Sequence, residues 1–336
     1  MKSVLNVLVL GGNGFIGRHA VAALRGVGHR VIVGSRTTGS NRQGTPLDVN
    51  PALEMRQVRL HQLLEAEDWM PLIRDVDVVL NCVGILRERP GESYDTVHHR
   101  GPAALARACA RSDKRLLHVS ALGLSSQARS RFIRSKLQGE QALRDAAPDC
   151  VIVRPSLLDG DGGFGAGWLR ALARFPVHVV PGGPGAHARM APLSARDLGE
   201  ALARLCVRSH GSPTTLDFGG PASLSMREYL SVLRPARLGQ AWCLVVPRWL
   251  ARIGSHVCDL FHWSPYSFGH FELMSKDNLP KVNALPAVLG RAPVAIGAAP
   301  SACDAGTGTA QWHPSLLAAK KTPPGAVVNR RSPRAV

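Results

Sequence analysis

The chain has 336 residues, of which 45% are hydrophobic, and its formal net charge is +17. This length allows one large α/β domain, or a nucleotide-binding domain with a smaller appended one. A basic chain is expected to bind nucleic acid when its lysines and arginines gather on one face. Here they are scattered through segments of amphipathic helical pattern, so we expect no specific nucleic-acid partner.

The cysteines and the amino-terminal residues indicate the cellular compartment. Seven cysteines form no C-x-x-C pair and lie mostly in apolar runs, which is typical of buried free thiols. Residues 1–3 lead directly into an apolar strand, with no small-residue cleavage site of the secretory type. We therefore expect a cytoplasmic protein without a metal site.

Membrane contact is a separate question. The longest apolar stretch, residues 241–254, is interrupted by proline and arginine, and it falls short of the roughly 18 residues that a membrane span needs. A transmembrane helix is therefore not expected. Trp242 and Trp249 keep open a peripheral contact with a membrane surface or a protein complex.

Over the first 155 residues, apolar runs rich in valine, isoleucine and leucine alternate with segments of helical period. Strands are expected at residues 4–10, 30–34, 57–60, 77–81, 115–120 and 150–154. Helices are expected between them at residues 15–26, 62–74, 94–110 and 132–146. This alternation predicts an α/β fold, a doubly wound parallel sheet of the Rossmann type with six strands and helices on both faces.

Glycine and proline become dense after Pro155, which indicates loops. Shorter helices are expected at residues 194–207, 225–233 and 247–260. In open α/β sheets a ligand lies beyond the carboxyl ends of the strands, where a loop-rich segment can close over it. We therefore predict a Rossmann core over residues 1–155 and a smaller C-terminal α/β region over 156–296, interleaved with the core and covering the substrate. Residues 297–336 are expected to form a basic tail with little order.

A glycine-rich loop follows the first strand and precedes the first helix. It consists of Gly11, Gly12, Asn13, Gly14, Phe15, Ile16 and Gly17. In the dinucleotide-binding pattern the first glycine permits a tight turn, the second lets the backbone approach a pyrophosphate, and the third allows close helix–strand packing. The amino end of the helix then offers unpaired N–H groups and a partial positive charge to the phosphates. We predict that this loop binds NADP or NAD.

The end of the second strand bears on which of the two is bound. An NAD site usually places an aspartate or glutamate there, which accepts hydrogen bonds from the ribose 2′-hydroxyl. This chain has Arg36, which can pair with a 2′-phosphate and stack on adenine, and Arg18 can lie close by. The sequence therefore favours NADP over NAD, although Arg18 fits a solvated helix position equally well.

Further short motifs accompany the later strands. They are Asn81–Gly84, His118–Ala121, Ser130–Glu140, Arg154–Ser156, Pro192–Asp197 and Leu216–Pro221. With the glycine loop, over roughly residues 4–290, the chain resembles the short-chain dehydrogenase/reductase superfamily in its extended, epimerase-like and atypical branch. Within that branch it looks most like proteins related to the nucleotide-binding accessory subunit of respiratory complex I. The resemblance implies cofactor contacts from Cys82, Val83, Gly84, Lys136, Pro155 and Ser156.

The same resemblance identifies the catalytic positions. Reductases of the family carry a tyrosine four residues before a lysine, so that both reach the nicotinamide from one helix face and the lysine lowers the tyrosine pKa. Here Lys136 holds the lysine position, but the tyrosine position is Phe132, whose ring cannot donate a proton. The usual serine position falls on Leu122. Cofactor binding and carbonyl reduction must therefore be judged separately.

The missing proton donor has few substitutes in the sequence. Ser125 or Ser126 could reach the site, and water or the substrate could also supply the proton. Structural roles are expected instead for Tyr94, His98, His99, Ser120, Asp159, Asp161 and Asp197.

Two functions follow from these observations. The first is an NADP-dependent oxidoreductase with an altered proton source, acting on an unidentified hydrophobic or carbonyl substrate. The second is a non-catalytic NADP-binding accessory, assembly or redox-sensing protein, which Phe132 favours because nucleotide binding can stabilise such a fold without turnover. Residues 245–271 either pack the smaller region or form an apolar pocket or docking surface. Their aromatic members are Trp249, Phe261, Trp263, Tyr266 and Phe268.

Overall fold

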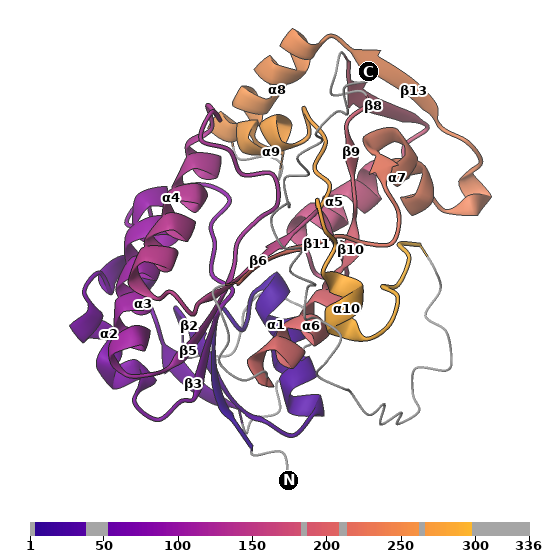
Figure 1. The fold of residues 1–336 in the computed structure, drawn as a ribbon. Coiled ribbons are helices and arrows are strands. Elements are labelled where there is room, and N and C mark those ends of the chain that lie inside the picture. The colour runs from indigo at the N-terminus through magenta and orange to yellow at the C-terminus, as the bar shows by residue number, and fades with distance from the viewer. Residues whose placement is uncertain (1–3, 38–52, 183–186, 208–213, 262–265, 298–336) are drawn as a thin grey trace, which may run out of the picture. The chain divides into compact units, whose positions relative to one another are not determined.

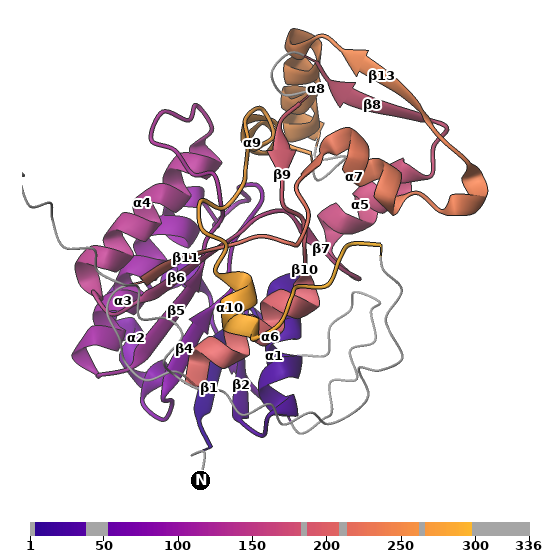
Figure 2. The same ribbon diagram turned by 45° about the vertical axis from the view of Figure 1, so that its right-hand side comes forward.

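A parallel sheet of seven strands forms the centre of the computed structural model, which describes residues 4–37, 53–182, 187–207, 214–261 and 266–297 (Figure 1 and Figure 2). Its strands are β1 (Asn6–Leu10), β2 (Arg30–Ser35), β3 (Glu54–Gln57), β4 (Val78–Asn81), β5 (Arg115–Val119), β6 (Val151–Pro155) and β11 (Thr214–Phe218). Their spatial order is β11-β6-β5-β4-β1-β2-β3, and all neighbouring pairs are parallel. All the carboxyl ends therefore meet at one edge, and the predicted doubly wound fold is confirmed.

Helices cover both faces of the sheet because successive strand residues point to opposite sides. In β1, Val7 and Val9 pack on one face, and Leu8 and Leu10 on the other. The helices on the first face are α1 (Phe15–Gly26), α6 (Ala195–Val207) and α10 (Leu285–Leu289). Those on the second face are α2 (Ala66–Ile73), α3 (Gly101–Arg111) and α4 (Arg131–Ala146). Every one of these β1 side chains is fully buried, as a central parallel strand requires.

Two strands differ from the sequence prediction. The third strand lies at Glu54–Gln57 rather than at 57–60, because Val58 and Leu60 enter the core from irregular backbone and a 3-10 turn. The seventh strand, β11, was not predicted. It pairs with β6 alone at the sheet edge and stays partly exposed, so it lacks the continuous apolar run of a central strand.

The predicted helix over residues 94–110 has two parts. A π-helical turn, Asp95–Arg100, precedes α3 and carries Val97 and His98 into the core. α4 packs directly against this turn, and a Cβ on Gly139 would overlap the carbonyl oxygen of His98. Glycine is therefore required where these two helical segments touch.

The second half of the chain adds shorter elements (Figure 2). They are β7 (Leu158–Asp159), α5 (Phe164–Ala173), β8 (Val177–Pro181), β9 (Arg189–Met190), β10 (Leu193–Ser194), β12 (Leu224–Ser225), α7 (Met226–Leu233), a 3-10 turn (Ala236–Leu238), β13 (Trp242–Val246), α8 (Arg248–Phe261) and α9 (Phe268–Leu273). β7 pairs with β10, β9 with β12, and β8 with β13. Ala173, Val180 and Leu230 form a small separate core between α5, β8 and α7.

The described residues of both halves belong to one compact unit, Met1–Ser301. β11, α6 and α10 come from the second half and complete the layers of the sheet. The predicted division at residue 155 stays a prediction, and the predicted tail beyond Gly297, like Trp263, lies outside the described residues. None of the described helices is both long and apolar enough to cross a bilayer.

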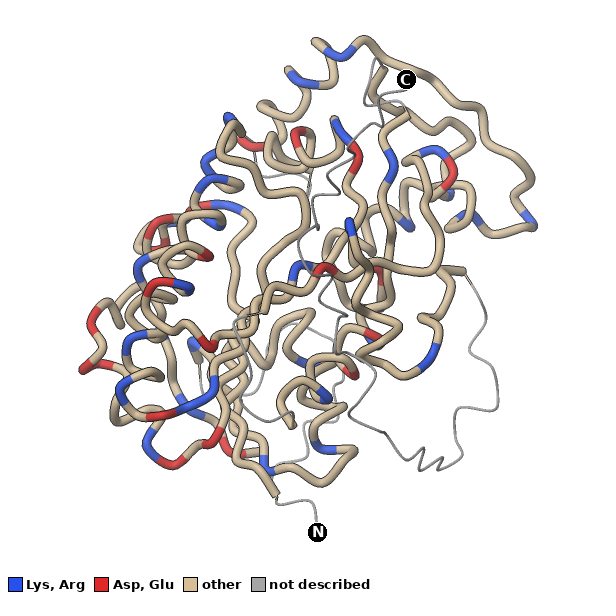
Figure 3. Tube along the Cα trace, in the orientation of Figure 1, with Lys and Arg blue, Asp and Glu red and all other residues tan. Residues whose placement is uncertain are grey.

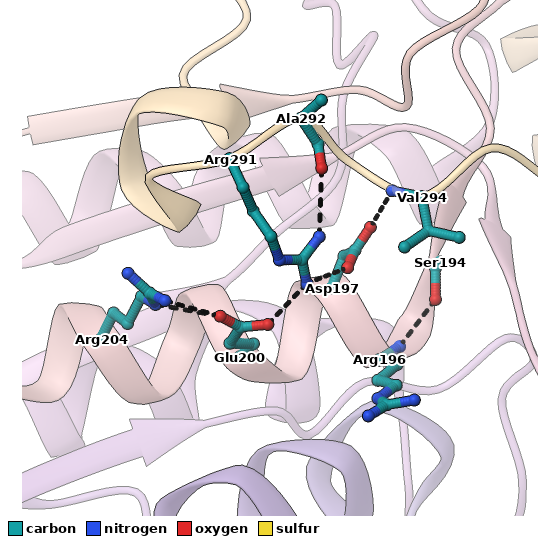
Figure 4. A network of polar contacts seen from close by, with 8 residues as sticks. All are labelled: Ser194, Arg196, Asp197, Glu200, Arg204, Arg291, Ala292 and Val294. Atoms are coloured by element: carbon teal, nitrogen blue, oxygen red, sulfur yellow. Dashed lines mark hydrogen bonds and ion pairs between the residues drawn. The ribbon is translucent and has the colours of Figure 1, made fainter. Parts of the chain in front are cut away.

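Asp197, in the first turn of α6, anchors the segment that follows α10 (Figure 4). Its side chain is 1% exposed and accepts hydrogen bonds from Arg291 at 2.7 Å and from the backbone N–H of Val294 at 2.7 Å. Arg291 also contacts Glu200 at 2.6 Å. Asp197 therefore lies in the first turn of its helix, as expected, and also fixes a distant part of the chain.

We predict that Arg291→Ala lowers the free energy of unfolding by about 3 kcal/mol, because it leaves the buried Asp197 carboxylate without its cation. Arg204→Ala is the matched control: it removes a more exposed pairing with Glu200 and should cost less than about 1 kcal/mol. Urea unfolding followed by tryptophan fluorescence measures both. Equal losses in the two variants would contradict the anchoring role of Asp197.

Candidate functional site

The glycine loop between β1 and α1 is held by backbone contacts. Gly11 has a φ of 71°, in the left-handed region, and its N–H donates to the carbonyl of Gly34 at 2.8 Å. A Cβ on Gly17 would overlap the carbonyl oxygen of Gly11, so α1 approaches the loop as closely as glycine alone permits. Gly14 is the N-cap of α1 and provides no side-chain cap. The amino end of α1 is therefore free to meet an anion.

The loop is also tied to β2. A Cβ on Gly12 would lie 2.9 Å from a methyl group of Val33, and the Asn13 side-chain amide donates to the Ser35 hydroxyl at 3.4 Å. These contacts place the predicted loop residues across the carboxyl ends of β1 and β2, where the fold positions ligands.

Arg36, just beyond β2, forms an ion pair. One guanidinium nitrogen donates to both carboxylate oxygens of Glu92, at 2.9 Å each, and the arginine side chain is 60% exposed. Arg18 does not join this pair. Its guanidinium lies 5.5 Å from the centre of the Phe15 ring and donates to the carbonyl of Asp161. The two arginines considered together for a 2′-phosphate thus contact different parts of the chain.

A buried polar pair shapes the loop after β4. The Asn81 side-chain amide donates to Nδ1 of His118 at 3.1 Å, and its oxygen accepts the backbone N–H of Val83 at 3.0 Å. Burial lowers the pKa of His118 to about 3, with a further contribution from nearby Lys136, so its imidazole is neutral. The segment Cys82–Gly84 is fixed by this pair.

Lys136 lies on α4, one helical turn after Phe132, and reaches toward that segment. A Cβ on Gly84 would lie 3.6 Å from Lys136 Nζ, which is 5.7 Å from the centre of the Phe132 ring. Burial lowers the pKa of Lys136 to about 8, although the charge of Glu140 opposes this effect. Within the described part of the chain, Nζ forms no hydrogen bond or ion pair. The amine therefore has free donors at the carboxyl edge of the sheet.

The Phe132 ring lies within an aromatic cluster. The ring centres of Tyr94, His98 and His270 are 5.9, 5.5 and 6.2 Å from it. Tyr94 and His98 meet it edge to face, whereas His270 is stacked on it at an interplanar angle of 24°. The family's tyrosine position is thus filled by a ring that packs and does not donate.

His98 supports this cluster through one defined tautomer. Its Nε2 accepts the backbone N–H of Ile85 at 3.1 Å, so the ring proton is on Nδ1. Nδ1 then donates to the Ser135 hydroxyl at 3.0 Å, and that hydroxyl donates to the Phe132 carbonyl at 3.0 Å. Burial, together with the charge of Lys136, holds the pKa of His98 well below its usual value of 6.5. Both ring nitrogens are occupied in structural bonds.

The other residues for which structural roles are expected also make local contacts. The Tyr94 hydroxyl donates to the carbonyl of Leu86 at 2.8 Å, and burial raises the pKa of this phenol to about 12. His99 lies 3.0 Å from Asp95 on the same turn. Asp159 accepts hydrogen bonds from Tyr229 and Arg170, and Asp161 accepts one from Arg170.

A cavity of about 1040 Å³ extends from the carboxyl edge of the sheet into the second half of the chain. Its wall contains these residues of the predicted site: Gly14, Phe15, Ile16, Cys82, Val83, Gly84, Lys136, Pro155 and Ser156. Phe132, Leu122 and Ser120 also line it, and the Ser120 hydroxyl forms no hydrogen bond with a described residue. Gly11, Gly12, Asn13, Gly17 and Arg36 lie outside the wall, as do Ser125 and Ser126.

The remaining wall of the cavity is mainly apolar. Its larger members are Leu86, Leu122, Trp168, Leu169, Leu172, Met190, Met226, Leu230, Leu250, Ile253, Val257, Leu273 and Met274. Aspartate and glutamate are absent from the lining residues that the structure describes, and Lys136, Arg189 and Lys276 are the charged ones. None of the described groups of His, Cys, Asp and Glu is arranged to hold a metal ion.

His270 and Tyr266 also line the cavity. Tyr266 belongs to the segment 245–271, for which an apolar pocket was one of the expected roles, whereas sequence reasoning did not name His270. The Ser267 hydroxyl lies 2.8 Å from Nδ1 of His270, and burial lowers the pKa of this imidazole to about 4. Ser267 also caps the amino end of α9. The serine three residues before a histidine could have suggested a helix start, but nothing in the sequence brings that helix to Phe132.

Comparison with known proteins agrees with this architecture. Residues 7–175 match the NAD dependent epimerase/dehydratase family. The mitochondrial NADH dehydrogenase (ubiquinone) 1 alpha subcomplex subunit 9 of Dictyostelium discoideum is 26% identical over 67% of this chain and 62% of its own length. Ceramide reductase of Caulobacter vibrioides is 30% identical over 52% of this chain and 53% of its own length. The chain thus spans between half and two thirds of these relatives.

Solved structures share the fold at low sequence identity. A nucleoside-diphosphate-sugar epimerase from Staphylococcus aureus aligns with a TM-score of 0.68 and 14% identity, over 87% of this chain and 98% of its own. The UDP-glucose 4-epimerase of Thermus thermophilus, solved as a complex with NAD, aligns with a TM-score of 0.54 and 20% identity, over 72% and 86% of the two chains. The resemblance to the complex I subunit and to epimerase-like enzymes is confirmed: the chain belongs to the NAD dependent epimerase/dehydratase family of NAD(P)-binding proteins.

Proposed function

We propose that this chain is an NADP(H)-dependent oxidoreductase that acts on an elongated, apolar carbonyl compound or the corresponding alcohol. The observation that carries the proposal is the cavity of about 1040 Å³, which joins the glycine loop and Lys136 to a mainly apolar wall. In this proposal the cofactor and the substrate occupy one continuous cavity, because hydride transfer requires the two to lie in contact.

The residues of the glycine loop fit a dinucleotide. The uncapped amino end of α1 at Gly14 offers N–H groups to a pyrophosphate, and the close approach at Gly17 keeps this helix end beside the loop. Cys82, Val83 and Gly84 line the cavity next to them. When bound, NADP(H) supplies the hydride chemistry.

Lys136 is proposed to hold the nicotinamide ribose through hydrogen bonds to its hydroxyl groups. Its Nζ has no partner among the described residues, and its pKa of about 8 keeps the amine mainly protonated at neutral pH. Such a cation would lose affinity for its acceptors above about pH 8, as the proton leaves. Arg36 is proposed to release Glu92 and pair with the 2′-phosphate, which favours NADP over NAD.

The apolar wall supports the substrate class. A sugar nucleotide presents many hydroxyl groups, each of which needs a hydrogen-bond partner once it leaves water. The polar groups of this wall are few, whereas leucine, methionine, valine and isoleucine provide nearly half of its residues. An alkyl chain gains free energy from such a lining without unpaired polar groups.

A second function has one specific observation in its favour. Phe132 provides no proton, and its neighbours Tyr94 and His98 are already engaged in hydrogen bonds. The alternative is a non-catalytic NADP(H)-binding accessory, assembly or redox-sensing protein. The names of the relatives support both possibilities, since one is a subunit of a respiratory complex and another a reductase.

The cofactor preference can be tested at Arg36. We predict that Arg36→Ala weakens NADPH binding by about tenfold and changes NADH binding little, because the lost group is a charge-assisted partner of the 2′-phosphate. Calorimetric titration of both nucleotides measures the ratio. Glu92→Gln is the matched change, which should strengthen NADPH binding by freeing the guanidinium. Tighter binding of NADH than of NADPH by the unaltered chain would overturn the preference.

Lys136→Met should separate binding from stability. Folding lowers the lysine pKa from 10.5 to about 8, so the charged amine costs stability below about pH 8, and stability rises as pH increases toward 10.5. We predict that the variant is more stable than the unaltered chain by roughly 2 kcal/mol at pH 7 without nucleotide, and that NADPH stabilises it less. Thermal unfolding with and without NADPH measures both effects. An unchanged NADPH-induced shift would exclude Lys136 as a cofactor contact.

Turnover can be measured with NADPH and straight-chain aldehydes and ketones of increasing length. We expect kcat/KM to rise about fourfold for each methylene group that the cavity buries, and then to level off. Lys136→Met is the inactive control. A flat dependence on chain length would contradict the apolar substrate class.

Phe132→Tyr distinguishes the two functions. Turnover by the unaltered chain, little changed by this substitution, supports the oxidoreductase and a proton source other than residue 132. Turnover that appears only after Phe132→Tyr identifies the natural chain as a nucleotide-binding protein without catalysis.

A further inference from the structure

α8 exposes its apolar face and packs through its polar one. Ser255 is fully buried, the Asp259 carboxylate accepts hydrogen bonds from Arg87 at 3.1 Å and from the backbone N–H of Phe268 at 2.8 Å, and His256 is stacked on the Phe268 ring with centres 4.5 Å apart. The exposed side chains of the opposite face are Trp249, Leu250, Ile253, Val257 and Leu260. An ordinary surface helix is arranged the other way round.

The adjacent β8–β13 ribbon exposes apolar side chains too. The strands are parallel, with Trp242 beside Val177 and Leu244 beside Val179, so these four residues share one face. All four are exposed, and Trp242 is the most exposed at 81%. On the other face, His178 and Val180 are buried. We call the exposed apolar side chains of these two elements together the apolar rim. They are Val177, Val179, Trp242 and Leu244 of the ribbon, and Trp249, Leu250, Ile253, Val257 and Leu260 of α8.

Positive charges predominate around the apolar rim. Residues 229–258, which contain β13 and most of α8, include four arginines and no aspartate or glutamate. Asp259, the acidic residue of α8, is paired with Arg87. Figure 3 shows basic segments along α8, which also contains Asp259, whereas both signs are mixed over the helices that cover the sheet. Arg174, Arg237 and Arg248 form no ion pair with any described carboxylate, and all three are exposed.

The apolar rim is continuous with the cavity. Val179, Leu250, Ile253 and Val257 line the cavity wall, and each of these side chains is also more than two fifths exposed. They therefore lie where the cavity meets the surface. An alkyl chain could pass from an apolar phase into the cavity over these residues without crossing water.

We propose that the apolar rim docks on the surface of an anionic lipid bilayer, so that the cavity opens toward the acyl region. Tryptophans beside a helix with an apolar face are typical of interfacial binding, and unpaired arginines add attraction to anionic headgroups. The excess of positive charge favours this partner over a second copy of the chain, because two copies of the rim would repel each other. Docking would deliver the apolar substrate of the proposed function, but binding itself does not depend on turnover.

Co-sedimentation of the full chain with vesicles tests the proposal. The vesicles are phosphatidylcholine alone and phosphatidylcholine mixed with phosphatidylglycerol. We expect binding to the anionic vesicles, a loss of about tenfold in the partition constant for Trp249→Ser, and a loss of about fivefold for Arg248→Gln on anionic vesicles only. Arg25→Gln and Val27→Ser, at the exposed end of α1, are matched controls that should bind like the unaltered chain.

Quenching of tryptophan fluorescence by brominated lipid gives a second measurement. It should fall in Trp242→Phe and Trp249→Phe, because these side chains enter the bilayer. The proposal is overturned if the rim variants and the α1 controls bind vesicles equally, since attraction would then come from elsewhere in the chain. It is also overturned if the rim variants change the sedimentation-equilibrium mass of the lipid-free chain and leave vesicle binding intact, which would identify the rim as an interface between copies.

The outcome is separable from that of the proposed function. Vesicle binding is measured without nucleotide or substrate, so it can succeed when turnover fails. Conversely, Trp249→Ser should keep its turnover of a detergent-dispersed aldehyde while losing turnover of the same aldehyde presented in anionic vesicles by about tenfold. Equal losses in detergent and in vesicles would overturn the delivery role.

Discussion

The close contact between α4 and the π-helical turn at Asp95–Arg100 is the constraint on which the site depends. Gly139 leaves no space for a Cβ beside the His98 carbonyl, so the axis of α4 is fixed against the turn. With the helix in this position, Lys136, one turn before Gly139, points toward Gly84. Phe132, one turn before Lys136, lies among Tyr94 and His98. The hydrogen bonds from Ile85 through His98 and Ser135 to the Phe132 carbonyl then lock the same contact.

The candidate site places the amine of Lys136 in a mainly apolar environment. Lys136 is kept beside a mainly apolar wall at a cost in folding free energy, which its lowered pKa expresses. Structural lysines are usually placed where water or a carboxylate solvates them. Here the nearest ion-pair system, Glu140 with Arg154 and Arg144, is complete without Lys136, so the amine keeps its donors for another acceptor. Lys136 thus lowers the stability of the fold at the position that we propose as a cofactor contact.

Much of this could be predicted from the sequence. The continuous apolar runs predict the central strands, because a strand covered on both faces must be apolar throughout. The spacing of Gly11, Gly14 and Gly17 predicts the loop, because the backbone there has no space for side chains. β11 escaped prediction because an edge strand pairs on one side only and needs no such run. His270 escaped because its contact with Phe132 joins residues far apart in the chain. The direction of the apolar face of α8 likewise depends on what Asp259 and Ser255 pack against, which periodicity alone does not reveal.

The ion pair between Arg36 and Glu92 means that the proposed recognition of a 2′-phosphate would be an exchange of one anion for another. To bind the phosphate, the guanidinium would have to leave both oxygens of a carboxylate whose side chain is only 12% exposed. The free energy gained from binding the phosphate would therefore be reduced by the free energy of the Arg36–Glu92 ion pair. Glu92 would lose its arginine partner, and His61 Nδ1 lies 3.9 Å from its carboxylate. In the proposed function, discrimination between the two nicotinamide nucleotides would therefore depend on both residues, and a change at Glu92 would adjust it as readily as a change at Arg36.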